Sequence, residues 1–95
     1  MAGYIQYCAD NNCMPDVITW HELDTWCLSP NGLAAHMRDF KKIWANTDWT
    51  KYNAANNTTG TPEIPQICIN EYAEMAYCGV PGRLVNWISR LEDEK

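Results

Sequence analysis

The sequence predicts an all-α fold, a compact bundle of four to five short helices forming a single domain over residues 1–95. Three observations support this prediction. Apolar residues recur at helical spacing in several segments, and Pro stands where helices commonly begin. The length of 95 residues is that of one domain, and the hydrophobic fraction of 46% is ordinary for a folded chain.

The first 16 residues fit either a helix or a strand. Tyr4, Ile5 and Cys8 suit one face of a helical turn, whereas the segment YIQYC also suits a strand. Because no pairing partner for such a strand is evident, we favour a helix.

A short helix is predicted to begin at Thr19 and to run through Cys27 or Leu28. Thr19 and Glu22 have the spacing of a capping box, in which each side chain satisfies a backbone N–H group at the start of a helix. Glu22 is therefore interpreted as a capping residue.

The central helix is predicted to start at Ser29 and Pro30, because Ser is a favoured N-cap and Pro at the first helical position lacks only an N–H group that would go unused. The helix is expected to end near Asn46. Apolar residues at spacings of four, three and four define its buried stripe. They are Leu33, Met37, Phe40 and Trp44.

A helical turn over 48–52 and a polar loop near 53–65 are predicted to follow. The loop segment, NAANNTTGTPEIP, has the Asn, Thr, Gly and Pro content of an exposed connection. Its length makes it the part of the chain that we expect to be most flexible.

Two further helices are predicted in the last third of the chain. Pro65 disfavours a helical residue before it, so a long helix is expected from near Pro65 to Cys78, with Gly79 at its terminating position. The last helix is expected to begin at Pro81. Its buried stripe would consist of Leu84, Ile88 and Leu91, with Trp87 beside it.

The segment INEYAEMAYCGVPGRLVNWISR, residues 69–90, resembles helix-turn-helix DNA-binding segments. The residues that carry the resemblance are Gly79, Val80, Val85, Trp87 and Ile88. The resemblance implies an accessory or DNA-binding regulator in which Arg83, Asn86 and Arg90 face the DNA groove. The alternative is an ordinary αα-hairpin, which the net charge of −5 favours because phosphate backbones repel an acidic protein.

Cysteine and histidine residues offer a third option, a small zinc-stabilised domain. Cys8, Cys13, His21 and Cys27 are four soft ligands, but their spacing differs from the close ligand pairs of common zinc modules. Thr25 stands where an H-E-x-x-H motif needs its second His. We therefore expect reduced thiols, no metal, no cofactor and no catalytic residue.

The function expected from these observations is non-enzymatic binding of a protein partner whose identity the sequence does not reveal. Five Trp residues support this expectation, because Trp is frequent at the energetic centre of protein contacts. The candidate contact residues are Trp26, Trp49, Tyr52, Tyr77 and Trp87, together with the basic residues Arg38, Lys41 and Lys42. Trp49 is expected to be exposed because it precedes the polar loop. Such small acidic chains look, in type only, like phage or mobile-element inhibitors such as anti-CRISPR proteins.

Localisation and assembly are predicted from what the sequence lacks. No apolar run approaches the roughly 20 residues that cross a bilayer, and the first residues lack the features of a signal peptide. We expect a cytoplasmic monomer or homodimer with no membrane contact, in the host cytoplasm if phage-encoded.

Overall fold

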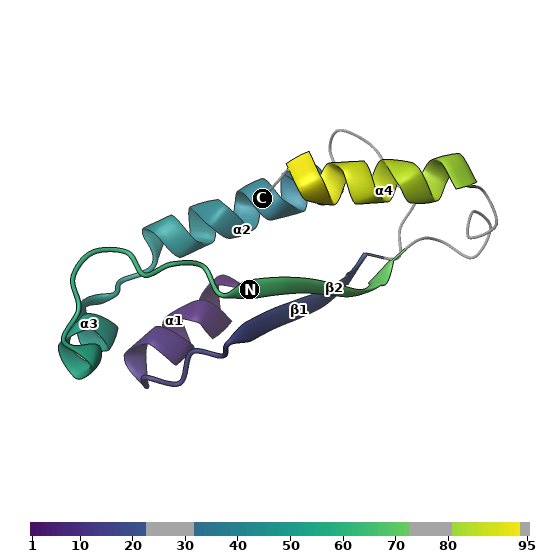
Figure 1. Cartoon of the computed structure of the whole chain (residues 1–95). Coiled ribbons are helices and arrows are strands. Elements are labelled where there is room, and N and C mark those ends of the chain that lie inside the picture. Colours follow the sequence, from purple (N-terminus) through teal and green to yellow (C-terminus); the bar gives the residue numbers. More distant parts are fainter. Residues whose placement is uncertain (23–31, 73–80, 94–95) are drawn as a thin grey trace. The chain divides into compact units, whose positions relative to one another are not determined.

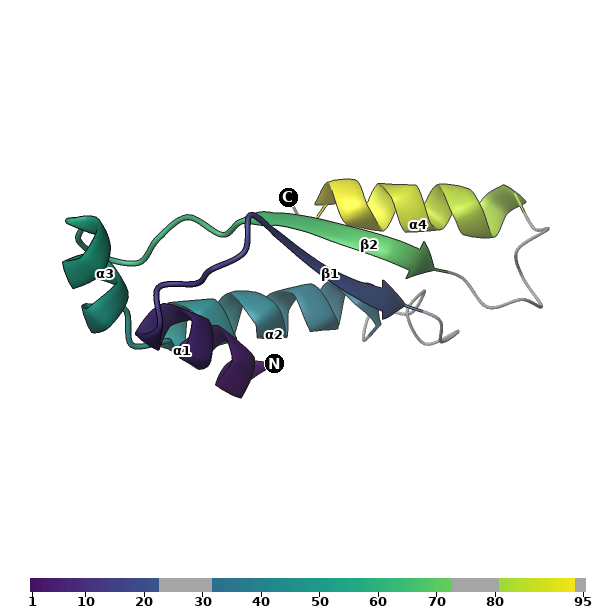
Figure 2. The same cartoon turned by 90° about the horizontal axis from the view of Figure 1, so that it is seen from below.

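The fold combines four helices and a small sheet in the part of the chain that the computed structural model describes, residues 1–22, 32–72 and 81–93 (Figure 1). In chain order the elements are α1 (Ala2–Asp10), β1 (Val17–Glu22), α2 (Leu33–Asn46), α3 (Thr50–Asn56), β2 (Gln66–Tyr72) and α4 (Pro81–Asp93). The two strands are hydrogen-bonded neighbours and run parallel (Figure 2). The all-α prediction is therefore wrong, and the fold is mixed α/β.

Strand β1 stands where a capped helix was predicted from Thr19. Along it Ile18 and Glu22 are buried, whereas Thr19 and His21 are exposed. This period of two is that of a half-buried strand, and its β-branched and aromatic residues favour strand conformation. Thr19 and Glu22 have the spacing of a capping box but lie in no helix. The rest of the predicted helix, residues 23–28, lies outside the described residues.

Strand β2 replaces the first half of the helix predicted from Pro65 to Cys78. The run Ile67-Cys68-Ile69 is continuous and apolar, as is typical of strands in parallel sheets. Periodicity does not separate such a short run from a buried helical segment. Residues 69–72, where the resemblance to a helix-turn-helix begins, therefore lie in a strand. The remaining residues of the predicted helix lie outside the described part, so DNA binding by residues 69–90 stays a prediction.

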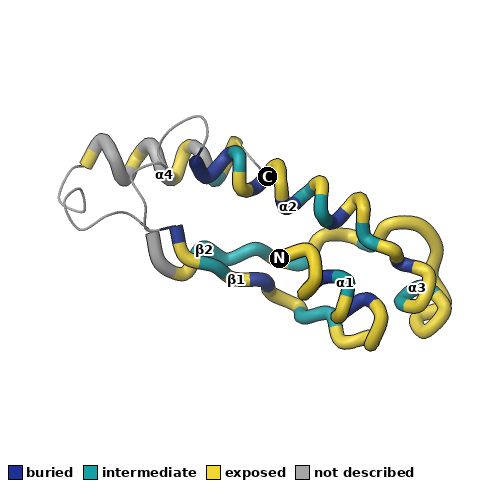
Figure 3. Tube along the Cα trace, turned by 180° about the vertical axis from the view of Figure 1, so that it is seen from behind, coloured by how far each residue is buried: buried dark blue, intermediate teal, exposed yellow. Residues whose placement is uncertain are grey.

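Three predicted helices are confirmed as α1, α2 and α4. All four residues of the predicted α2 stripe are buried, and Figure 3 shows buried positions recurring along this helix. The predicted start at Ser29 lies outside the described residues. In α4 the predicted buried stripe is wrong at Ile88, which is exposed, as is Val85.

The first of two compact units contains residues 1–18 and 40–67, and aromatic rings form much of its core. The ring centroids of Phe40 and Trp44 are 5.9 Å apart, and those of Trp44 and Trp49 are 4.6 Å apart. Tyr52 meets Trp49 edge-on at 5.7 Å. Buried Ile5 on α1 belongs to the same unit, in which α1 and α3 are in contact.

The polar segment predicted as a loop over 53–65 begins as the second half of α3. Asn57 follows this helix with a left-handed backbone (φ 54°), which Asn tolerates better than most residues. Asn53 donates a hydrogen bond to Gly60 O (2.8 Å) and accepts one from Thr58 Oγ1 (2.8 Å). The loop is therefore tied back to the helix before it, and its flexibility stays a prediction.

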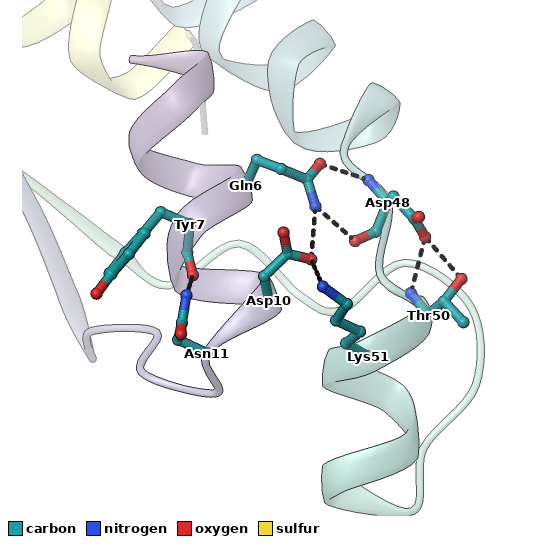
Figure 4. A network of polar contacts seen from close by, with 7 residues as sticks. All are labelled: Gln6, Tyr7, Asp10, Asn11, Asp48, Thr50 and Lys51. Atoms are coloured by element: carbon teal, nitrogen blue, oxygen red, sulfur yellow. Dashed lines mark hydrogen bonds and ion pairs between the residues drawn. The ribbon is translucent and has the colours of Figure 1, made fainter.

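A polar network links α1 to the start of α3 (Figure 4). Gln6 donates through Nε2 to Asp48 O (3.1 Å) and accepts from Asp48 N (3.0 Å), while Lys51 lies 3.6 Å from Asp10. The Asp48 carboxylate accepts from the hydroxyl of Thr50 (2.6 Å) and from its backbone N–H (3.0 Å). These two bonds, led by the hydroxyl, hold the pKa of Asp48 below its ordinary value.

Thr50→Val should raise the pKa of Asp48, because it removes the hydroxyl that contributes most to lowering it. A lowered pKa in the folded protein stabilises the fold above the pKa of the unfolded chain, and this contribution disappears as the pH falls through the folded value. NMR titration of the Asp48 carboxyl carbon measures the change. Thr61→Val is the matched control at an exposed threonine. An unchanged Asp48 titration in Thr50→Val would contradict the assignment.

Candidate functional site

The candidate site is built around Glu22, the last residue of β1. Its side chain is 3% exposed, and it is the one buried charged residue in the chain as far as the structure describes it. This residue belongs to the second compact unit, residues 19–39 and 68–95. Burying a carboxylate costs free energy unless hydrogen bonds compensate for the lost hydration. The hydrogen-bond partners of Glu22 are therefore the starting point for interpreting the site.

Two aromatic rings contact the Glu22 carboxylate. Trp20 Nε1 donates to Oε1 at 2.6 Å, and His36 Nδ1 lies 2.9 Å from Oε1 and 3.0 Å from Oε2. Trp20 reaches Glu22 because residues two apart in a strand share a face. His36 comes from the first turns of α2. Which of the two groups donates depends on the tautomer of His36, and the hydrogen is on Nδ1 whenever the carboxylate is ionised, because an ionised carboxylate only accepts.

A second acidic residue, Glu71, lies near the corresponding end of β2. The hydrogen bond from Gln66 N to Asp16 O (3.2 Å) pairs Gln66 with Val17 in a parallel ladder. Continued along both strands, this register sets Glu71 beside Glu22. Neighbouring strands are about 4.8 Å apart. The backbone therefore places two glutamates side by side at the carboxyl ends of parallel strands.

The structure describes the side chains of five residues predicted to contact a protein partner: Arg38, Lys41, Lys42, Trp49 and Tyr52. Trp49 is 6% exposed and donates to Trp44 O (3.0 Å), so its expected exposure is wrong, and Tyr52 is half-buried against it. Of the basic residues on α2, Arg38 and Lys42 are exposed and Lys41 is half-buried. Partner binding by these residues stays a prediction.

The structure does not describe the side chains of the remaining candidate contact and DNA-binding residues. Trp26 and Tyr77 lie outside the described residues. Four others lie on α4, where only their backbone is described: Arg83, Asn86, Trp87 and Arg90.

The suggested zinc ligands do not form a described cluster. Cys8 is buried on α1, Cys13 is exposed after that helix, and His21 is exposed on β1, while Cys27 lies outside the described residues. Within residues 1–22, 32–72 and 81–93, no group of three His, Cys, Asp or Glu side chains is placed to hold a metal ion. The zinc-stabilised domain therefore finds no support in this part of the chain.

Sequence reasoning missed both glutamates of the site. Glu22 was interpreted as a helix cap, and Glu71 fell within the helix predicted from Pro65 to Cys78. A usable signal was present, because the segments VITWHE and ICINEY each contain a β-branched apolar run followed by an acidic residue.

The chain is similar in sequence to short segments of two enzymes named as arabinofuranosidases. It is 32% identical over 94 residues to a 3-O-β-L-arabinopyranosyl-α-L-arabinofuranosidase of Bifidobacterium pseudocatenulatum, a match that covers 99% of this chain and 8% of that enzyme. It is 33% identical over 85 residues to a 3-O-α-D-galactosyl-α-L-arabinofuranosidase of Bifidobacterium longum subsp. longum, covering 88% of the chain and 6% of the enzyme. The chain thus spans less than a tenth of either relative.

Other comparisons identify no further relationship. No protein-family model matches the chain, and no solved structure matches it significantly. The inhibitor and phage interpretation has no support in these similarities, and the all-helical architecture that accompanied it is wrong. None of the described helices has the length and apolar character needed to span a bilayer.

Proposed function

We propose that the chain contributes the carboxyl groups of a glycoside hydrolase site that cleaves α-L-arabinofuranosides, with Glu22 and Glu71 as the reacting pair. One observation carries the proposal. A buried, hydrogen-bonded glutamate ends a parallel strand, and the register sets a second glutamate beside it on the neighbouring strand. In α/β enzymes, ligands bind at the carboxyl ends of parallel strands.

The spacing of the two strands favours a retaining reaction. Retaining glycosidases hold their carboxyl groups about 5–5.5 Å apart, whereas inverting enzymes need roughly 6.5–9.5 Å to admit a water molecule. The two residues belong to neighbouring strands whose backbones are about 4.8 Å apart, and we propose the shorter, retaining separation for their carboxyl groups. One carboxyl group would protonate the leaving oxygen while the other attacks the anomeric carbon. Water would then release the sugar from the glycosyl-enzyme ester, with the first carboxylate accepting its proton.

The names of the two relatives support the proposed substrate class. Both are named for cleaving an α-L-arabinofuranose unit that carries another sugar at O3, and the two names differ in that sugar. The element common to both names is the α-L-arabinofuranoside, so we propose this unit as the substrate recognised by the chain.

Incubation of the purified chain with 4-nitrophenyl α-L-arabinofuranoside tests the proposal. We expect release of nitrophenol and, by proton NMR, first appearance of the α-anomer of arabinose, because double displacement retains configuration. The β-D-galactopyranoside of nitrophenol is the matched control substrate. A folded chain that does not hydrolyse the arabinofuranoside would overturn the proposed function, and first appearance of the β-anomer would overturn the retaining pair.

A further inference from the structure

We infer that His36 is a positioning residue, which holds the Glu22 carboxylate in the orientation used for glycoside cleavage. This inference rests on the proposed function and assigns a task to a residue that does not itself react. The observation behind it is that one ring nitrogen, Nδ1 of His36, lies within 3.0 Å of both carboxylate oxygens.

The orientation of a carboxylate needs such external contacts. The last torsion of a Glu side chain is broad and roughly two-fold, so the side chain alone does not fix the plane of its oxygens. Trp20 Nε1 bonds Oε1 alone, whereas His36 Nδ1 bridges Oε1 and Oε2. Together the two rings oppose rotation of the group, and the bridging contact from His36 involves both oxygens.

The position of His36 is itself set by the core. Its backbone N–H donates to Gly32 O at 3.0 Å, within the helical hydrogen-bond pattern that opens α2. Leu33 and Met37 on the same helix are buried. Donors carried by a packed helix are held more accurately than donors on a loop.

The His36 ring contributes little to packing, which makes the inference testable. Its side chain is 55% exposed, in contrast to the 3% of Glu22. Removing the ring should therefore leave the fold largely intact while removing the contact that bridges the two carboxylate oxygens. A displacement of about 1 Å in a reacting group can lower a rate by about 100-fold.

His36→Ala should lower kcat for the arabinofuranoside by about 10- to 100-fold and leave KM unchanged, because the ring orients Glu22 and does not bind the sugar. His36→Asn places an amide N–H close to the former Nδ1–H and should recover most of the lost kcat. Asn46→Ala, at an exposed position at the end of the same helix, is the matched control. Circular dichroism checks that each variant is folded.

The outcomes separate this inference from the function on which it rests. A folded wild-type chain without activity contradicts the proposed function. An active wild type whose kcat survives in His36→Ala contradicts the positioning role alone. A raised KM at unchanged kcat also contradicts it, since that pattern indicates direct contact with the sugar. In ¹⁵N NMR of the wild type, we expect the hydrogen on Nδ1 of His36, and a ring protonated only at Nε2 would overturn the contact.

Discussion

Glu22→Gln or Glu71→Gln should lower the rate of arabinofuranoside hydrolysis by about 10²- to 10⁴-fold. A glutamine side chain has nearly the shape of glutamate, but it can neither transfer a proton at neutral pH nor attack the anomeric carbon as a carboxylate. In Glu22→Gln the amide oxygen can still accept the bond from Trp20 Nε1, whereas the amide nitrogen cannot accept one from His36 Nδ1. We expect kcat to fall in folded protein, because the carboxyl chemistry is lost together with one contact of His36.

Glu63→Gln is the control for this pair of variants. It removes the same charge at an exposed position in the connection that precedes β2, so we expect a rate close to that of the wild type. Initial rates at saturating substrate, together with thermal unfolding curves, compare the three variants. Either site variant retaining more than half of the wild-type kcat would remove that residue from the proposed pair.

The helices could be predicted from the sequence because their signal is local. Leu33, Met37, Phe40 and Trp44 recur within three turns, and each is buried as this pattern requires. The strands could not be predicted in the same way. Their pairing joins residues 50 apart, as in the bond from Gln66 N to Asp16 O, and no local pattern encodes that partner.

The candidate site was missed because the two strands that carry Glu22 and Glu71 were not predicted. A Thr and a Glu three residues apart indicate a helix cap only if a helix follows, and the same spacing occurs in β1. The contacts of Glu22 depend on His36, which is 14 residues away on another element. Once β1 and β2 are known to be parallel, the acidic residues near their ends become neighbours.

The predicted partner surface failed at Trp49 for a different reason. Its position just before a polar segment suggested exposure, but α3 starts directly after it. The indole lies 4.6 Å from the ring of Trp44 and donates its N–H to Trp44 O. Hydrogen bonding satisfies the polar edge of the ring, so burial costs little.

Trp44→Ala should destabilise the fold by about 3–5 kcal/mol, since it removes a large ring from the core and leaves a cavity. Trp44 is 2% exposed, makes tilted ring contacts with Phe40 and Trp49, and donates to Pro62 O at 2.7 Å. The lost contacts thus include the hydrogen bond to Pro62 O, which ties the segment between α3 and β2 to this core. In a domain of this size each kcal/mol corresponds to roughly 4–8 °C, so the melting temperature should fall by more than about 12 °C.

Tyr7→Ala is the matched control for this large effect. Tyr7 is also an aromatic residue on a helix, but it is 63% exposed, and such surface substitutions usually change stability by less than about 0.5 kcal/mol. Urea denaturation of both variants, followed by circular dichroism, gives the two free energies of unfolding. Equal values for Trp44→Ala and Tyr7→Ala would contradict the aromatic core described here, because only the Trp44 ring is buried.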